Sequence, residues 1–251
     1  MKLGIIGGSG LYDLPGLEEL GQHKVMTAWG APSAPLTCGR LHGVELVFLP
    51  RHGSNHHLPP HRINYRANIA ALADAGVEAI VATAAVGGIE HRAGTGAIVV
   101  PHQIIDYTYG REHTYSDGTA AHPQHVDFSE PYSGDLRTAL ISAAAAVAIP
   151  VLPQGVYAAT QGPRLESAAE IDRLERDGCT IVGMTGMPET ALARELGIAY
   201  ANISLVVNPA AGRAHGEITM ADIERELLLG MGRIRNVLGA LAAQLITGAS
   251  C

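Results

Sequence analysis

Several short segments of the sequence carry residue types that bind an inorganic anion. In Gly7-Gly8-Ser9-Gly10 the glycines let the backbone approach an anion, and the amides and the Ser9 hydroxyl can donate to it. In Arg51-His52 the arginine presents a planar fork of donors, and the histidine adds a donor that is charged or neutral. Thr185 lies just before the helix start at Pro188, where a helix N-terminus favours an anion. The simpler alternatives are a glycine turn and a surface arginine beside a capping histidine.

Two other classes of site are excluded by spacing. A dinucleotide fingerprint would need a third glycine where Asp13 stands, and Pro15 interrupts the helix that should follow. His56, His57 and His61 invite a metal interpretation, but no carboxylate or cysteine accompanies them at ligand spacing. We therefore expect neither a nicotinamide cofactor nor a metal ion.

Further segments suit a flat organic ligand. The small residues of Thr83–Gly88 leave room beside the backbone, although close packing of a helix would explain them too. Glu166 can accept an N–H from a base edge or favour the dipole of the helix that follows. Asn208 ends an apolar run and can donate and accept at once, but an asparagine before proline is also a common turn residue.

These residues must be positioned by alternating strands and helices. Apolar runs of strand length occur at Leu3–Ile6, Val44–Leu49, Ala79–Val86, Ala97–Val100, Gly155–Thr160, Thr180–Met184 and Ala199–Val207. Helical patterns occur at Asn64–Ala75, Ser133–Val147, Ser167–Arg176, Pro188–Leu196 and about Thr219–Leu245, the last opening with a capping-box pattern. Because the apolar runs are continuous, we predict an α/β sandwich around a mainly parallel or mixed sheet, in one domain over residues 1–251. In such sheets, sites form where strand ends meet loops.

Composition narrows the partners and the compartment. The net charge of −7 argues against a nucleic-acid partner, which would require a basic stripe. No apolar run is long enough to cross a membrane, and the chain start lacks the pattern of a signal peptide. The cysteines are three, far apart and without a CxxC pair, so a disulfide framework is not expected. We expect a cytoplasmic protein.

The order of the motifs is more specific than any one of them. IIGGSGLY, RHG, NYRANI, AVGGI, QGPRLES, VGMTGMPE and SLVVN follow one another from residue 5 to residue 208. This series resembles the trimeric class of nucleoside phosphorylases, which includes purine nucleoside and methylthioadenosine phosphorylases, and it is most similar to the branch that acts on methylthio-nucleosides. The resemblance implies a three-layer α/β sandwich with a central mixed sheet, a phosphorylase/hydrolase-like fold. It also implies a role in purine salvage, with phosphate as co-substrate and no cofactor.

The resemblance also assigns site residues. It implies a phosphate site of Ser9, Arg51, His52, the Ala85 backbone and Thr185, with His52, Thr185 and Asn208 taking part in catalysis. It implies nucleoside contacts from Val86, Gly87, Leu165, Glu166, Met184, Asn208, Ile218, Met220 and Ile223, and a homotrimer in which His125 reaches the neighbouring site. Two positions depart from the family pattern: Ala84 replaces a hydroxyl or amide side chain, which leaves open whether Thr83 compensates, and Leu165 replaces a common phenylalanine.

The purine base is predicted from the acidic residues that are missing. Adenine-specific relatives carry aspartate where Asn208 and Ala210 stand. Asn208 can donate to a 6-oxo group and accept from a protonated N7, while Glu166 can accept from the N1–H of hypoxanthine. A site built around such bonds rejects the wrong base, because buried polar groups would stay unpaired. We therefore expect a 6-oxopurine.

The sugar is predicted from the stretch Glu217–Ile223. Ile218, Met220 and Ile223 would form an apolar wall suited to a methylthio group, or they are the core face of the last helix. The resemblance favours the wall, so the expected reaction is phosphorolysis of 5′-methylthioinosine. The alternatives are phosphorolysis of inosine or guanosine, phosphorolysis of methylthioadenosine, a hydrolase that uses water, and an inactive nucleoside-binding protein.

Overall fold

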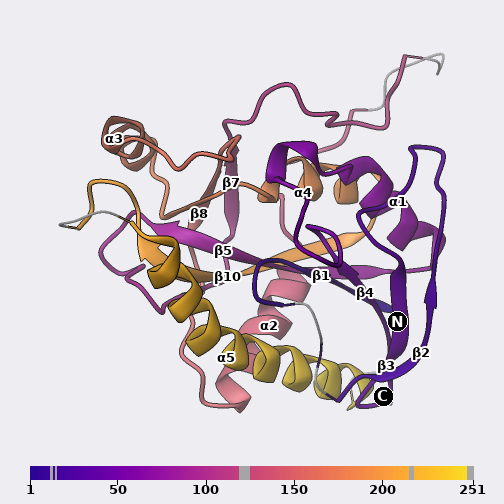
Figure 1. The fold of residues 1–251 in the computed structure, drawn as a ribbon. Coiled ribbons are helices and arrows are strands. Elements are labelled where there is room, and N and C mark those ends of the chain that lie inside the picture. The colour runs from indigo at the N-terminus through magenta and orange to yellow at the C-terminus, as the bar shows by residue number, and fades with distance from the viewer. Residues whose placement is uncertain (12–13, 15, 119–124, 215–217, 248–251) are drawn as a thin grey trace.

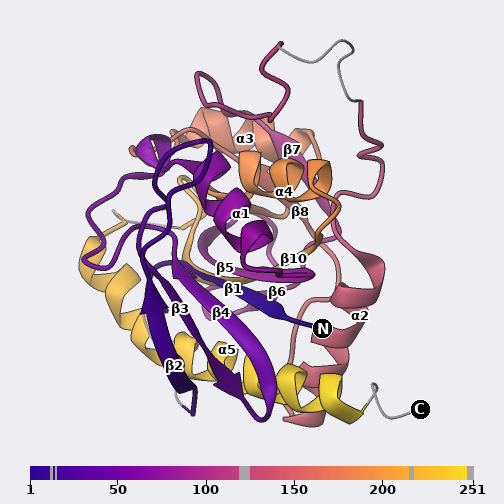
Figure 2. The ribbon, with the colours of Figure 1, turned by 90° about the vertical axis from the view of Figure 1, so that its right-hand side faces the viewer.

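A ten-stranded mixed sheet runs through the middle of the molecule and carries helices on both faces (Figures 1 and 2). The computed structural model describes residues 1–11, 14, 16–118, 125–214 and 218–247. The strands are β1 Leu3–Gly7, β2 Glu18–His23, β3 Leu36–Leu41, β4 Val44–Pro50, β5 Ala79–Gly88, β6 Ile98–Val99, β7 Gln103–Asp106, β8 Val156–Ala159, β9 Ile181–Gly183 and β10 Ala199–Pro209. The helices are η1 Pro60–Arg62, α1 Tyr65–Asp74, α2 Gly134–Ala146, α3 Ala168–Arg176, α4 Gly186–Glu195 and α5 Met220–Thr247.

The strand pairing makes the sheet mixed. Strands β4, β1, β5 and β10 are parallel neighbours, so their carboxyl ends lie at one edge. Strands β7, β8 and β9 are parallel to one another, but β9 runs antiparallel to β5. The hairpin strands β2 and β3 extend the sheet beyond β4 in antiparallel fashion. The predicted α/β fold with a central mixed sheet is thereby confirmed. The single-domain organisation stays a prediction, with which one continuous sheet is consistent.

Each face of the sheet buries a separate apolar core. Because neighbouring side chains of a strand point to opposite faces, Ile5 and Ile6 of β1 enter different cores. The core on the side of Ile5 is closed by α2 and by α5, including Ile234 and Leu241. The core on the side of Ile6 is closed by α1 and α4, and α3 packs beside them over β8 and β9. The result is three layers, with α1, α3 and α4 on one face and α2 and α5 on the other (Figure 1).

Every apolar run predicted as a strand overlaps an observed strand, to within a residue or two at each end, but three strands were missed. Strand β2 has the sequence EELGQH and is almost wholly exposed at the edge of the sheet, so nothing selects apolar residues there. Strand β3 alternates around a glycine, and β7 has only four residues. A search for continuous apolar runs therefore finds the central strands and not the edge strands.

The predicted helices are confirmed to within a few residues. Asn64 caps α1 by accepting from the Ala67 N–H, and Gly76, with φ of 77°, follows its last turn. At the start of α5 the Thr219 hydroxyl accepts from the Asp222 N–H, as a capping box requires, and donates to the Asp222 carboxylate. None of the described helices is long and apolar enough to cross a membrane.

Candidate functional site

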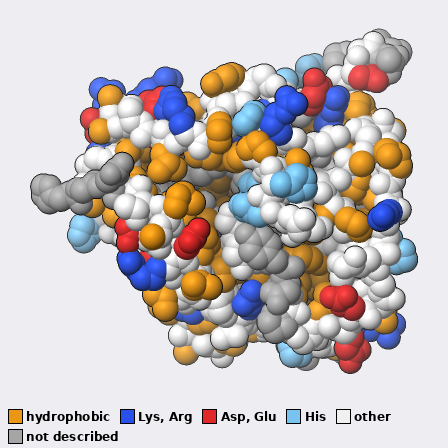
Figure 3. All heavy atoms as spheres, viewed as in Figure 1, with side chains coloured by type: hydrophobic (Ala, Val, Ile, Leu, Met, Phe, Trp, Pro, Cys, Tyr) orange, Lys and Arg blue, Asp and Glu red, His pale blue; other side chains and the backbone are white. Residues whose placement is uncertain are grey.

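A cavity of about 540 Å³ opens at the carboxyl ends of the parallel strands. On the face shown in Figure 3, hydrophobic and histidine side chains gather near the middle. All but one of the sequence-predicted site residues line this cavity: Ser9, Arg51, His52, Ala85, Val86, Gly87, Leu165, Glu166, Met184, Thr185, Asn208, Ile218, Met220 and Ile223. The exception is His125.

The sheet topology explains why these distant segments meet. Ser9 follows β1, Arg51 follows β4 and Asn208 stands near the end of β10, and these strands are parallel. Strand β9 runs the other way, with Val182 opposite Gly87. The residues after β9, Met184 and Thr185, therefore run back beside the middle of β5 and face the same cavity.

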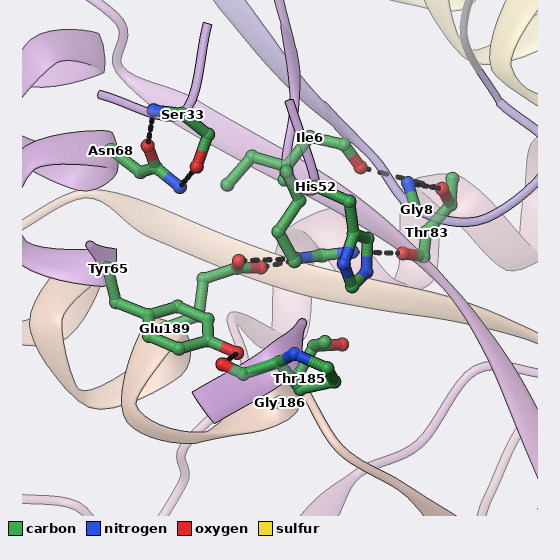
Figure 4. Close-up of polar contacts among 12 residues, drawn as sticks. Ile6, Gly8, Ser33, His52, Tyr65, Asn68, Thr83, Thr185, Gly186 and Glu189 are labelled. Atoms are coloured by element: carbon green, nitrogen blue, oxygen red, sulfur yellow. Dashed lines mark hydrogen bonds and ion pairs between the residues drawn. The ribbon is translucent and has the colours of Figure 1, made fainter. Parts of the chain in front are cut away.

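The glycine loop after β1 lies directly against β5. A Cβ on Gly8 would stand 2.5 Å from the Thr83 carbonyl oxygen, so only glycine permits this approach. The Gly8 N–H donates to the Thr83 hydroxyl over 2.9 Å (Figure 4). Thr83 is fully buried, while its neighbour Ala84 lines the cavity. Thr83 is thus not placed to replace the hydroxyl that Ala84 lacks.

Arg51 does not present its whole fork to the cavity, which corrects the simple expectation from its type. It is 1% exposed and forms a bidentate ion pair with Glu189, at 2.7 and 2.8 Å (Figure 4). Its Nη1 also donates to the Thr83 carbonyl over 2.8 Å. Each guanidinium nitrogen is therefore engaged, and only the remaining hydrogens on Nη1 and Nη2 can reach an anion. Burial alone would lower the pKa of Arg51, but Glu189 raises it, so the guanidinium stays charged.

Glu189 is a residue that sequence reasoning missed. The sequence indicates only an acid at the start of a helix, whereas the side chain is fully buried and also accepts from the Tyr200 hydroxyl at 2.6 Å. Removing one partner of a buried ion pair is strongly destabilising, because the other charge stays buried and unpaired. Helices commonly begin with an acidic residue, so an acid beside Pro188 does not by itself indicate a buried ion pair. The partner of Glu189, Arg51, lies 138 residues away in the sequence.

His52 is held in one tautomer. Its Nδ1 lies 2.8 Å from the Leu58 carbonyl oxygen, which can only accept, so Nδ1 carries the hydrogen. Burial, and next to it the positive charge of Arg51, lowers the pKa of His52 to about 4. At neutral pH the ring is therefore uncharged, and its Nε2 is an acceptor. Of the two states left open for this residue, the structure favours the neutral one.

Thr185 stands at the N-terminus of α4, as predicted. It is 6% exposed, and its side chain makes no capping bond to the helix. The backbone at Met187 is extended, with φ of −117° and ψ of 141°, so the regular helix begins at Pro188. Thr185 lines the cavity beside the first turn of this helix.

Two polar side chains stand in the part of the cavity assigned to the base. The Glu166 carboxylate accepts from the Thr160 hydroxyl over 2.6 Å, which orients it at the end of β8. Asn208 is 9% exposed, and its Nδ2 donates to the Pro209 carbonyl over 2.7 Å, which leaves a second Nδ2 hydrogen and Oδ1 for a ligand. The pairing of β10 with β5 shifts register between Val206 and Asn208. This irregularity lets Val207 and Asn208 both line the cavity, and Ala210 lines it beside them.

Arg111 is a second residue that sequence reasoning missed. It is 9% exposed and donates to the carbonyls of Met184 (2.8 Å), Thr160 (3.2 Å) and Gln161 (2.8 Å). These carbonyls belong to the loops after the neighbouring parallel strands β8 and β9, and residues of both loops line the cavity. The guanidinium therefore ties the two loops together, and a lone arginine in a polar segment carries no signal of that role.

The apolar residues near the start of α5 line the cavity. The sequence left two interpretations of them open, an apolar wall of the cavity or the core face of the last helix. Ile223 is partly buried and also packs against the core, so both apply to it. Met220 is 65% exposed and is therefore not a core residue in this chain. Ile218 is also on the cavity wall, and Glu217 lies outside the described residues.

His125 is not among the residues that line the cavity of its own chain. It is exposed and belongs to the segment between β7 and α2, which projects from the body of the molecule (Figures 1 and 2). Its role in a neighbouring site stays a prediction. In the part of the chain that the structure describes, no cluster of three or more histidine, cysteine or acidic side chains is placed to hold a metal ion.

Comparison with known proteins identifies relatives over nearly the whole chain. Residues 2–243 match the model of the family described as the phosphorylase superfamily. The chain is 55% identical to a "probable S-methyl-5′-thioinosine phosphorylase" of Pseudomonas syringae pv. tomato, over 93% of this chain and 95% of that protein. It is 44% identical to a "6-oxopurine nucleoside phosphorylase" of Pyrococcus furiosus, over 88% and 84% respectively. Among solved structures, methylthioadenosine phosphorylase from Schistosoma mansoni in complex with adenine matches with a TM-score of 0.94 and 32% identity, over 100% of this chain and 93% of that one. These matches confirm the resemblance found from the sequence.

Proposed function

This chain belongs to the phosphorylase superfamily, and we propose that it uses inorganic phosphate to cleave S-methyl-5′-thioinosine. The products are hypoxanthine and 5-methylthioribose 1-phosphate. The observation that carries the proposal is one cavity with three unlike regions. Donors to an anion stand at Ser9 and Thr185, an amide and an acid at Asn208 and Glu166, and an apolar wall at the start of α5.

The choice of a 6-oxopurine rests on the region around Asn208. Two hydrogens on Nδ2 allow a bond to the base oxygen while the bond to the Pro209 carbonyl is kept. Glu166, held by Thr160, is an acceptor for the N1–H that a 6-oxopurine carries. Ala210 supplies no carboxylate to accept from a 6-amino group. The N1 atom of adenine carries a lone pair and no hydrogen, so it would face a lone pair of the Glu166 carboxylate. The 6-amino group of adenine would also find no carboxylate at Ala210 to accept its hydrogen.

The chemical step is a displacement at the ribose C1′ carbon. A phosphate oxygen forms a bond to C1′ with inversion, the C1′–N9 bond breaks, and its electron pair passes into the purine. The departing base takes a proton at N7, where Asn208 Oδ1 accepts the N–H, and phosphate gives up a proton overall. The phosphate charge stabilises the cationic sugar, so positioning and electrostatics carry most of the acceleration. The reaction as written uses no metal or organic cofactor.

The assembly and compartment are part of the same proposal. We propose a homotrimer in which His125 enters the neighbouring cavity near the 5′ substituent. The exposure of His125, which does not line the cavity of its own chain, supports this proposal. We propose a cytoplasmic location, supported by the free thiols of Cys38 and Cys179, since reducing compartments keep cysteines unpaired.

The test is base release from methylthioinosine, methylthioadenosine and inosine, each with and without phosphate. Phosphate-dependent release of hypoxanthine, fastest from methylthioinosine, is the expected result. Equal use of inosine would refute the 5′ argument, and preference for methylthioadenosine would refute the base argument. Release that needs no phosphate would indicate a hydrolase, and binding without release would indicate a nucleoside-binding protein.

A further inference from the structure

The hydrogen-bonding state of His52 determines whether an anion bound beside it must donate or accept a hydrogen. The bond from Nδ1 to the Leu58 carbonyl fixes the hydrogen on Nδ1. His52 is 8% exposed and lines the cavity, and its Nε2 has no hydrogen-bond partner among the described residues. In the neutral ring, Nε2 therefore offers the cavity a lone pair and no hydrogen. An anionic oxygen without a hydrogen would meet that lone pair and be repelled.

The charges around His52 come from few groups. Arg51 precedes it at the end of β4, and the Arg51 charge is compensated by the buried Glu189 of α4. The His56 ring lies 4.5 Å away, between centroids, in the turn that follows. Burial lowers the pKa of His56 too, which disfavours a positive charge there. His57 and, farther round the wall, Glu166 are the other titratable side chains that line the cavity. The anion region therefore consists largely of dipolar donors and one compensated arginine.

We propose that His52 selects the protonation state of the bound oxyanion: Nε2 accepts a hydrogen from a hydroxyl group of phosphate, so that the site discriminates against tetrahedral anions that carry no hydrogen. This inference rests on the proposed function, since it assumes that phosphate occupies this part of the cavity. Phosphate and arsenate carry such a hydrogen at neutral pH, and sulfate does not.

The proton balance follows from this geometry. Below the second pKa of phosphate the free ion already carries two hydrogens, and it binds without taking up a proton. Above that pKa the dianion still carries one hydrogen, which it can donate to Nε2, so it too binds without taking up a proton. Sulfate binds only when His52 itself takes up a proton, because Nε2 must then donate. The affinity for sulfate should therefore fall about tenfold per pH unit throughout this range.

The experiment is calorimetric titration of the full-length protein with phosphate and with sulfate, between about pH 6 and about pH 8.5, in two buffers of different ionisation enthalpy. We expect a sulfate Kd that rises about tenfold per pH unit, with uptake of about one proton. The phosphate Kd should change far less over the same range, with little proton uptake, because both phosphate ions carry a hydrogen for Nε2. A sulfate Kd independent of pH, or a phosphate Kd that rises as steeply with pH as the sulfate Kd, would overturn the inference.

A variant and a matched control separate this role from a structural one. His52→Gln can donate or accept at the same place, so phosphate and sulfate should bind with a ratio that no longer depends on pH. His61→Gln, on the exposed surface of η1, should keep the pH-dependent ratio. A ratio that keeps its pH dependence in His52→Gln would assign the effect to another group and refute the inference.

The same data distinguish the two failures. If base release depends on phosphate but the sulfate Kd does not change with pH, only the inference about His52 is wrong. If neither anion binds and base release is independent of phosphate, the proposed function is wrong and the inference is overturned with it.

Discussion

Replacing Asn208 by aspartate should swing the base preference from 6-oxo to 6-amino purines. Asn208 is 9% exposed, so the new carboxylate would stand in a nearly water-free part of the cavity. It would lose the donor to the Pro209 carbonyl, now 2.7 Å from Nδ2, and it would lose the donor to the base oxygen. In return it would accept from a 6-amino group.

The magnitude follows from separating these effects. The contact with the Pro209 carbonyl is the same for both substrates, so it cancels in a ratio of kcat/KM values. Facing a 6-oxo group with an acceptor costs about 1–3 kcal/mol, and a bond from a 6-amino group to a charged acceptor contributes about 1.5–3 kcal/mol. The ratio should therefore shift by about 2.5–6 kcal/mol, or roughly two to four orders of magnitude.

The assay is kcat/KM for methylthioinosine and methylthioadenosine in the wild type and in Asn208→Asp. Glu166 still faces N1 in the single variant, so Glu166→Gln combined with Asn208→Asp should move the ratio further. A ratio that changes less than about threefold in the single variant, with phosphate KM preserved, would show that Asn208 does not contact the 6-position.

The remaining predictions concern the last helix and His52. Gly230→Ala should destabilise the fold despite the better helix propensity of alanine, because the new Cβ would stand 2.4 Å from a leucine of β10. Gly232→Ala, whose Cβ would meet nothing within 4 Å, should instead raise the free energy of unfolding by up to about 1 kcal/mol. Denaturant unfolding measures both changes. Ile223→His should raise the use of inosine relative to methylthioinosine by roughly tenfold to a hundredfold, since a polar group replaces part of the apolar wall; an unchanged kcat/KM ratio would contradict that role. His52, whose pKa falls from 6.5 to about 4 on folding, should make the protein lose about 3 kcal/mol of stability as pH falls from 6.5 to about 4; unfolding curves of His52→Gln should show a loss smaller by that amount.

The sequence alone determined the fold class, the central strands and the residues that meet in the cavity. Continuous apolar runs mark strands covered on both faces, and the residues after such strands gather at one edge when the strands are parallel. For this reason the order of residues along the chain is enough to group Ser9, Arg51 and Asn208 in one site. The edge strand β2 could not be predicted from the sequence, because its side chains face solvent and burial therefore selects no apolar pattern there.

Only the tertiary structure decided how the chemistry is set up inside the cavity. Glu189 neutralises Arg51 across 138 residues, and no local rule pairs one buried acid with one distant base. The Thr83 hydroxyl accepts from the Gly8 N–H, while its neighbour Ala84 lines the cavity. The state of His52 depends on its burial and on a carbonyl in the following loop. Residue types and local periodicity are properties of the chain, whereas pairing, burial and orientation depend on which distant segments the fold brings into contact.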